Sequence, residues 1–145
     1  MSQTNFETET KKNKPNFKDS KYATGRRKRS IAKVWVKKGS GNIHVNGLKM
    51  NEYFKRPVHQ IIVTRPLQIS EVETSYDVKC SVKGGGLSGQ AGAIILGISK
   101  ALIAHDENLK TNLKKDKLTT RDSRVVERKK YGHRKARRSF QFSKR

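Results

Sequence analysis

The chain has 145 residues, and its 34 Lys and Arg against 12 Asp and Glu give a formal net charge of +22 at pH 7. Such a charge destabilises a small folded domain unless an anionic partner neutralises it, and we expect that partner to be nucleic acid. A membrane is the poorer partner, because we find neither a basic amphipathic helix with a bulky apolar face nor an apolar run approaching ~18 residues.

Composition divides the chain into three parts. Residues 1–21 are polar and are expected to form a disordered extension, residues 22–127 a globular domain, and residues 128–145 a basic tail. The extension shows no signal-peptide pattern, and it carries Glu7, Glu9 and Asp19 but no Arg, unlike a mitochondrial transit peptide. Synthesis inside an organelle is compatible with this composition.

A basic run, Arg26–Arg29, leads directly into a predicted strand over Ser30–Lys37. For this run we favour RNA binding. Alternate residues of the strand are apolar, which predicts a buried face of Ala32, Val34 and Val36 and an outer face of Ile31, Lys33, Trp35 and Lys37. The outer lysines suit a phosphate backbone and plain solvent equally well.

The segments that follow predict a hairpin and two short helices. Lys38–Asn42 is glycine-rich and is expected to connect the strand 30–37 to a returning strand over Ile43–Val45, with a tight turn at Asn46-Gly47. Prolines then limit two short helices, Met50–Lys55 before Pro57 and Val58–Val63 before Pro66.

The clearest strand is Tyr76–Lys83, whose strict alternation predicts a buried face of Tyr76, Val78, Cys80 and Val82. Cys80 is the only cysteine of the chain, which excludes an intrachain disulfide and a cysteine-based metal cluster. On a buried face it is expected to act as a small core side chain and not as a reactive thiol.

Gly84-Gly85-Gly86 follows this strand and leads into an amphipathic helix that ends near His105, with Ser88 as its predicted N-cap. Glycines at 89, 92 and 97 weaken a helix, so we expect them to permit close approach to another backbone. The glycine loop suits RNA phosphate. Nucleotide binding is not favoured, because the Gly-Lys-Ser/Thr ending of a P-loop is missing and residues 83–104 include no carboxylate for a metal.

The end of the globular part predicts a short helix over Asp106–Lys115, a turn over Thr119–Arg124, and a brief strand or docking segment at Val125-Val126. The tail then carries nine Lys or Arg among 18 residues and no acid. Its few apolar residues follow neither helical nor strand periodicity, so we expect it to be extended or disordered alone and to track RNA, with aromatics available for stacking. A solvated tail that only aids solubility is the alternative.

Eight different motifs follow one another along residues 22–145: Thr24–Lys28, Val45–Gly47, Glu52–Phe54, Gly84–Ala93, Thr120–Asp122, Val126–Gly132, Lys135–Arg138 and Gln141–Arg145. Together they resemble small-subunit ribosomal protein nine in its bacterial or organellar form. The resemblance implies an α+β fold like the second domain of ribosomal protein five. In that fold a four-stranded sheet is backed by helices, and a long extended basic C-terminal tail follows.

The resemblance also implies a structural role in the small ribosomal subunit, in the bacterial cytoplasm or the mitochondrial matrix. The partners would be rRNA of the 3′ major domain in the head, neighbouring head proteins, and the anticodon stem-loop of the P-site tRNA. No enzymatic activity, cofactor or metal is expected.

On the matching positions, Ser143, Lys144 and Arg145 would contact tRNA. Ile95 and Leu96 stand where family members usually carry a basic residue and often His, which leaves open any RNA contact made there. The expected rRNA-binding residues are Arg26, Arg27, Lys28, Arg29, Gly84, Gly85, Gly86, Arg121, Arg124, Arg128, Lys129, Lys130, Tyr131, Arg134, Lys135, Arg137 and Arg138.

Two other classes of function were weighed against this one. An enzyme could use the glycine loop with His44, His59, His105 or His133 as an acid–base group, but no two of these histidines have metal-ligand spacing and no nucleophile–base arrangement stands out. A non-ribosomal protein that binds or compacts nucleic acid is the second alternative, and it lacks a recognisable module for reading DNA grooves.

Overall fold

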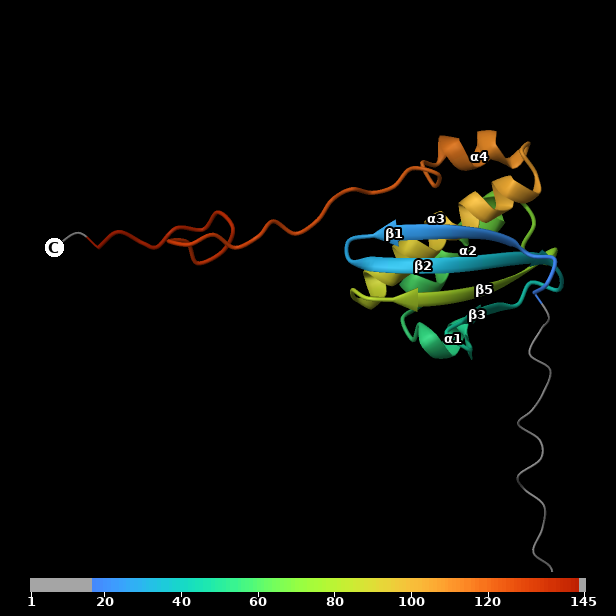
Figure 1. The fold of residues 1–145 in the computed structure, drawn as a ribbon, viewed down its shortest axis with the longest axis horizontal. Helices are drawn as coiled ribbons and strands as arrows, with labels where there is room; N and C mark the ends of the chain where they lie inside the picture. The colour runs from blue at the N-terminus through green and yellow to red at the C-terminus, as the bar shows by residue number, and fades with distance from the viewer. Residues whose placement is uncertain (1–16, 144–145) are drawn as a thin grey trace, which may run out of the picture.

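The computed structural model describes residues 17–143, which form one α+β domain and a C-terminal segment (Figure 1). The strands are β1 Lys21–Arg27, β2 Ser30–Lys38, β3 Ile43–Val45, β4 Leu48–Lys49 and β5 Tyr76–Lys83. The helices are α1 Met50–Tyr53, α2 Pro57–Ile69, α3 Leu87–His105 and α4 Leu109–Lys115.

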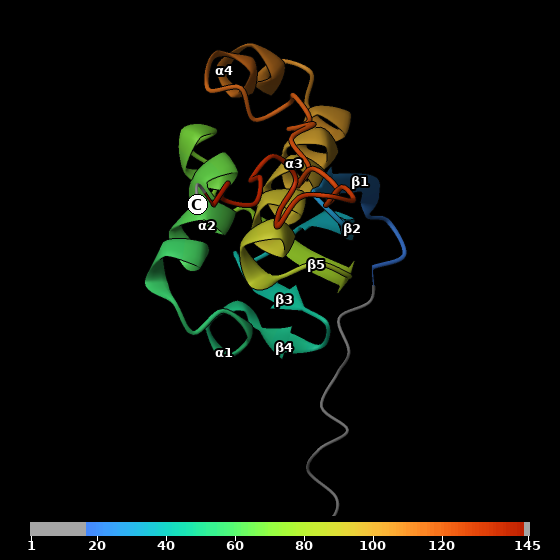
Figure 2. The same cartoon turned by 90° about the vertical axis from the view of Figure 1, so that its left-hand side faces the viewer.

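These strands make one mixed sheet in the order β1-β2-β5-β3-β4, so the predicted fold class is confirmed, with five strands in place of the four expected. Figure 1 views the sheet from the face opposite α2 and α3, which lie behind it. Figure 2, turned by 90°, shows the two helices layered against that far face. The domain therefore has two layers, and within residues 17–143 no helix covers the other face of the sheet, which we call the open face.

The centre of the sheet is the antiparallel pair of β2 and β5, in which Val34 lies opposite Cys80 and Val36 opposite Val78. All four side chains are buried, as the alternation predicted. Burial raises the pKa of the Cys80 thiol well above its ordinary value, so the side chain behaves as a core hydrophobe.

Strand β1 was not predicted, because its basic residues were assigned to a segment ahead of the first strand. It pairs antiparallel with β2, and Gly25 lies opposite Ala32. A Cβ at Gly25 would lie 1.8 Å from the carbonyl oxygen of Ala93 and 2.7 Å from the amide nitrogen of Gly97. The backbones of β1 and α3 are thus in contact, which confirms at Gly97 the close approach predicted from the glycines of the helix, whereas Gly89 and Gly92 make room for the side chains of Ser30 and Arg27.

The predicted hairpin between β2 and β3 is wrong. Strand β3 pairs in parallel with β5 and antiparallel with β4, and the tight turn at Asn46 and Gly47 joins β3 to β4. The Asn46 side chain extends the pairing with β5, because its Oδ1 accepts from Val82 N at 2.8 Å and its Nδ2 donates to Val82 O at 3.1 Å. A non-local partner therefore replaced the local one that the glycine-rich connection suggested.

Proline limits the helices differently from the prediction. Pro57 stands at the first turn of α2, where its missing N–H costs nothing, and α2 continues through Pro66 to Ile69. Val63, Pro66 and Leu67 are buried together, so burial of this stripe outweighs the lost backbone hydrogen bond at Pro66.

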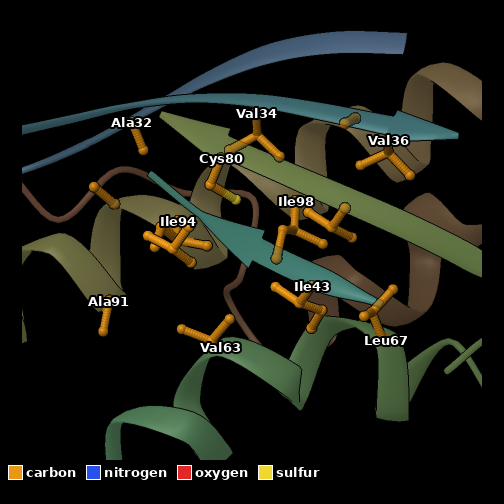
Figure 3. Packing of buried hydrophobic residues seen from close by; sticks show 14 of the residues in the cluster. Ala32, Val34, Val36, Ile43, Val63, Leu67, Cys80, Ala91, Ile94 and Ile98 are labelled. Carbon is orange, nitrogen blue, oxygen red and sulfur yellow. The ribbon is translucent and has the colours of Figure 1, made fainter. Parts of the chain in front are cut away.

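Helix α3 fills the core between the sheet and α2. Figure 3 shows Ile94 and Ile98 of this helix between Val34 and Cys80 of the sheet and Val63 of α2. By length and composition α3 could cross a membrane, but 67% of its most apolar window is buried inside the fold, as in the core helix of a folded domain. Helix α4 is shorter than the segment Asp106–Lys115 predicted for it and adds the buried Leu113.

Candidate nucleic-acid interface

The basic run Arg26–Arg29 lies at the end of β1 and in its turn to β2, and its side chains diverge. Arg26 is exposed on the open face of the sheet, whereas Arg27 is directed at α3. A Cβ at Gly92 would meet the Arg27 side chain within 2.2 Å, so this glycine makes room for it. Lys28 has a φ of 52° at the turn, and both Lys28 and Arg29 are exposed there.

The glycine loop lies beside this turn, because the antiparallel register brings Lys83, at the end of β5, opposite Ile31 of β2. Gly84 and Gly85 have φ values of 75° and 62°, the left-handed region that favours glycine. Two side chains hold the loop from outside it: Ser30 Oγ donates to Gly84 O at 3.0 Å, and Gln90 Nε2 donates to the same oxygen at 3.1 Å.

The start of α3 differs from the prediction in its cap. The helix begins at Leu87 with Gly86 as N-cap, and no side chain caps it. Ser88 lies within the first turn, where its Oγ is 3.1 Å from Nε2 of the buried His59. The N–H groups of the first turn of α3 therefore have no side-chain cap and face the end of the glycine loop.

A groove of about 570 Å³ joins three segments that are far apart in the sequence. The turn contributes Lys28 and Arg29, and the loop contributes Gly85 and Gly86. The third wall is the chain from Val125 to Lys129, which brings Arg128 and Lys129 beside the other cations and Glu127 as the one carboxylate of the lining. Four cations around uncapped backbone N–H groups suit a phosphate chain.

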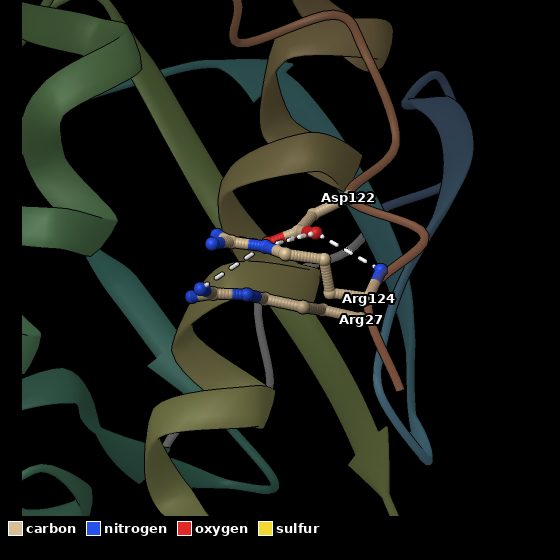
Figure 4. A network of polar contacts seen from close by, with 3 residues as sticks. All are labelled: Arg27, Asp122 and Arg124. Atoms are coloured by element: carbon tan, nitrogen blue, oxygen red, sulfur yellow. Dashed lines mark hydrogen bonds and ion pairs between the residues drawn. The ribbon is translucent and has the colours of Figure 1, made fainter. Parts of the chain in front are cut away.

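Asp122 fixes the point at which the chain leaves the domain (Figure 4). Its Oδ2 lies 2.9 Å from Arg124 Nη2 and 3.4 Å from Arg27 Nη2, and its Oδ1 accepts from the Arg124 backbone N–H at 3.1 Å. Hydrogen bonds from Arg124, together with the charges of Arg124 and Arg27, hold the pKa of Asp122 far below its usual range. The contact ties β1 to the segment that begins the tail.

Beyond Asp122, the described chain has no helix or strand and runs away from the domain (Figure 1). Of the brief strand or docking segment predicted at Val125-Val126, the strand is not formed. Their side chains are exposed on the wall of the groove instead.

Within the tail, one isolated bridge joins His133 and Ser139, and Arg134 N donates to Arg138 O at 2.8 Å. The Arg134 guanidinium lies 5.2 Å from the centre of the Phe140 ring.

Glu127 is the carboxylate that directly precedes the tail. It accepts from Lys130 at 2.6 Å and from Arg137 at 3.0 Å, and these two cations lower its pKa. Tyr131 is 94% exposed and Phe142 is 84% exposed, so their rings are open to stacking.

The structure brings together six of the residues predicted to bind rRNA: Lys28, Arg29, Gly85, Gly86, Arg128 and Lys129 all line the groove. Gly84 shapes the loop behind it. Arg27 and Arg124 are paired with Asp122, and Arg26 and Arg121 are exposed outside the groove. The remaining predicted positions follow along the tail: Lys130, Tyr131, Arg134, Lys135, Arg137, Arg138 and Ser143. Lys144 and Arg145 lie outside the described residues.

Sequence reasoning missed the residues that organise these cations. Asp122 and Glu127 were not selected, although each is adjacent to a basic residue, Arg121 and Arg128, and Glu127 is the last acid before the basic tail. Also missed were Arg65 and Lys117, which join Arg26 and Arg27 around a second pocket of about 250 Å³. Ile95 and Leu96 line that same pocket.

Among residues 17–143, no group of three His, Cys, Asp or Glu side chains could hold a metal ion. The candidate interface consists of cations, backbone N–H groups and exposed rings. Comparison with protein-family models finds a match to the family described as Ribosomal protein S9/S16, over residues 25–145. The matched range begins within β1 and includes the glycine loop, the groove and the whole tail.

Proposed function

The chain belongs to the ribosomal protein S9/S16 family, and from this premise we propose that its groove and tail bind rRNA in the head of the small ribosomal subunit. A protein of this family is a structural component of the small ribosomal subunit and acts in translation; such proteins are generally not enzymes. The proposal concerns which surface of the protein binds the RNA. It also assigns the protein to the ribosome of a bacterial cytoplasm or of a mitochondrial matrix.

One observation carries the proposal: the turn after β1, the glycine loop before α3 and the base of the tail meet in a single groove. Lys28, Arg29, Arg128 and Lys129 supply its charge, and the cations continue without an acid from Arg128 to the end of the chain. A phosphate chain that enters the groove can therefore continue along the tail. Exposed Tyr131 and Phe142 offer stacking surfaces on the way.

We further propose that Ser143, Lys144 and Arg145 form a tip that leaves the rRNA and contacts the anticodon stem-loop of the P-site tRNA. An arginine at the end of the chain offers a planar guanidinium that can donate two parallel hydrogen bonds to one phosphate. The neighbouring proteins of the head would then hold the domain while the tail passes between RNA segments.

Sedimentation through a sucrose gradient after a high-salt wash tests the groove. The variant Arg29→Glu with Lys129→Glu reverses two cations of the lining and should leave the small subunit during the wash. The control, Lys110→Glu with Lys114→Glu, makes the same charge change on α4 and should remain bound. Release of both variants to the same extent would mean that only the total charge matters.

Deletion of residues 143–145 tests the tip separately. We expect normal assembly into subunits and a weaker retention of P-site tRNA, measured by filter binding of tRNA to purified subunits. Equal tRNA affinity for subunits with the intact and the shortened protein would exclude the proposed role of the tip and leave the groove untouched.

A further inference from the structure

The open face of the sheet carries side chains in cross-strand rows. Tyr22 of β1 lies opposite Trp35 of β2, and Trp35 lies opposite Lys79 of β5. Lys79 in turn lies opposite His44 of β3, and His44 opposite Lys49 of β4. One row of five side chains thus crosses every strand of the sheet on the face that α2 and α3 do not cover (Figure 1).

The aromatic part of this row is partly open to solvent. The rings of Tyr22 and Trp35 have centroids 5.4 Å apart, and Tyr22 is 50% exposed. Lys79 Nζ lies 5.9 Å from the centre of the Trp35 ring and 5.7 Å from that of Phe17, which approaches from the segment before β1. Two adjacent rings therefore lie beside an exposed cation.

Two more rows lead from these rings toward the groove. The first consists of Thr24, Lys33 and Ser81, and the second of Arg26, Ile31 and Lys83. None of the side chains in the three rows is acidic, and Arg26, Lys33 and Lys83 are exposed. Rows on one face are about 7 Å apart, so the path from Tyr22 to Arg26 is about 13 Å long. It ends at the turn of Lys28 and Arg29, where the groove begins.

We propose that this open face is a second RNA-binding surface, on which unpaired bases stack on Tyr22 and Trp35 while Lys33, Lys79 and Lys83 bind the phosphates. Cations alone would also suit an acidic protein. An exposed Tyr22 ring beside the partly exposed Trp35 ring, with cations around both, favours single-stranded nucleic acid, because every base has a face that can stack on an aromatic side chain. The inference rests on the proposed function only in taking RNA as the ligand.

Trp35 is the only tryptophan of the chain, so its fluorescence reports on this face and not on the tail. We would titrate the full-length protein with a short oligouridylate and, separately, with inorganic polyphosphate and polyglutamate of similar charge. The expected result is saturable quenching of Trp35 by the oligouridylate and little quenching by the other two polyanions. Equal quenching by polyphosphate would overturn stacking, and quenching by polyglutamate alone would identify an acidic protein as the partner.

Two matched pairs of variants locate the site. Tyr22→Ala should weaken the affinity for the oligouridylate, measured by the quenching of Trp35, about tenfold. Ile61→Ala, at an exposed position of α2, should leave that affinity unchanged. Lys33→Gln should weaken it more than Lys110→Gln on α4. Circular dichroism checks that each variant is folded.

Filter binding of the same oligouridylate separates this inference from the proposed function. If the RNA is retained but Trp35 is not quenched, the open face is not an RNA surface and the groove and tail bind alone. If the RNA gives neither retention nor quenching, both proposals are wrong.

Discussion

The domain and the tail place their apolar side chains in opposite environments. In the domain, Val34 of β2 and Ile98 of α3 are fully buried in the core between the sheet and the helices. In the tail, Tyr131 and Phe142 are almost fully exposed, and the contacts are exposed ion pairs, a few hydrogen bonds, one isolated bridge and one cation–ring contact. Burial thus determines the conformation of the domain, whereas the tail's own contacts are of the exposed kind that contributes little.

This difference indicates how each region meets RNA. The domain offers a preformed surface, because its turn and glycine loop are set by the sheet and by α3. The tail offers charge, and Glu127 forms ion pairs with Lys130 and Arg137. An RNA phosphate can take the place of that carboxylate, so the tail is expected to change its conformation on binding while the domain is not.

Removal of the tail should give the largest effect. If about six phosphates of single-stranded RNA are neutralised by the intact protein, the logarithm of the binding constant should fall with the logarithm of salt at a slope of roughly −4. A chain ending at Glu127 should show a much flatter slope, and at ~0.1 M salt an affinity lower by about 10³-fold. Filter binding over a range of salt measures both. An unchanged slope would place the binding charge on the domain, around Arg26–Arg29.

A matched pair of glycine substitutions compares folding in the two regions. Gly25→Ala puts a Cβ into the backbone of α3 and should cost about 3 kcal/mol of unfolding free energy, because neither backbone can move away without losing the pairing of β1. Gly132→Ala makes the same change in the tail, where φ is 69° and the added Cβ would meet no other part of the protein within 4 Å. Thermal unfolding should be unaffected by this second change. A Gly25→Ala protein with normal stability would contradict the contact between β1 and α3.

The glycine loop gives a second pair with a smaller effect. At Gly85 the φ is positive and a Cβ would meet Ser30 Oγ, whereas at Gly86 the backbone is extended and the space is open. We expect Gly85→Ala to cost about 1–2 kcal/mol and Gly86→Ala almost nothing, measured by urea unfolding. Equal costs would contradict the proposal that the positive φ of Gly85 and its contact with Ser30 decide the effect.

The elements that sequence reasoning predicted well are those with a clear period. Tyr76–Lys83 alternates strictly, and its buried face, Cys80 included, was predicted correctly. Strand β1 escaped because its inward residues are Ala23, Gly25 and Arg27, which give no apolar alternation. Ala23 and Gly25 are small, and the Arg27 side chain lies along α3, because the helix packs so close to β1. That packing is a property of the tertiary structure and leaves no periodic pattern in the strand.

The same limit applied to the site. The cations were predicted as a set to bind rRNA, but nothing in the run Arg26–Arg29 shows that Arg27 turns inward while Lys28 and Arg29 lie beside the glycine loop. Strand order decided that outcome: β5 lies beside β2, and its end brings the loop to the turn. The partner of β3 was missed for a related reason, since β5 lies about 30 residues further along the chain.

The smallest effect is expected at Asp122, where the two regions join. Because the pKa of this carboxyl is lowered by Arg124 and Arg27, its stabilising contact is fully present above the ordinary carboxyl pKa of about 3.9 and is lost only as the pH falls through the lower value of the folded protein. Asp122→Asn should leave thermal unfolding of the domain nearly unchanged, since the carboxylate lies at the surface with 29% of its side chain exposed and surface ion pairs contribute little. The segment after it should become more mobile, which the heteronuclear NOE of the Arg124 amide measures at pH 7. The intact protein should keep a high NOE at pH 4, and the control Asp116→Asn should match it. A low NOE at Arg124 in the intact protein at pH 7 would mean that the tail begins before Asp122, and that the ion pairs of Figure 4 do not hold the two regions together.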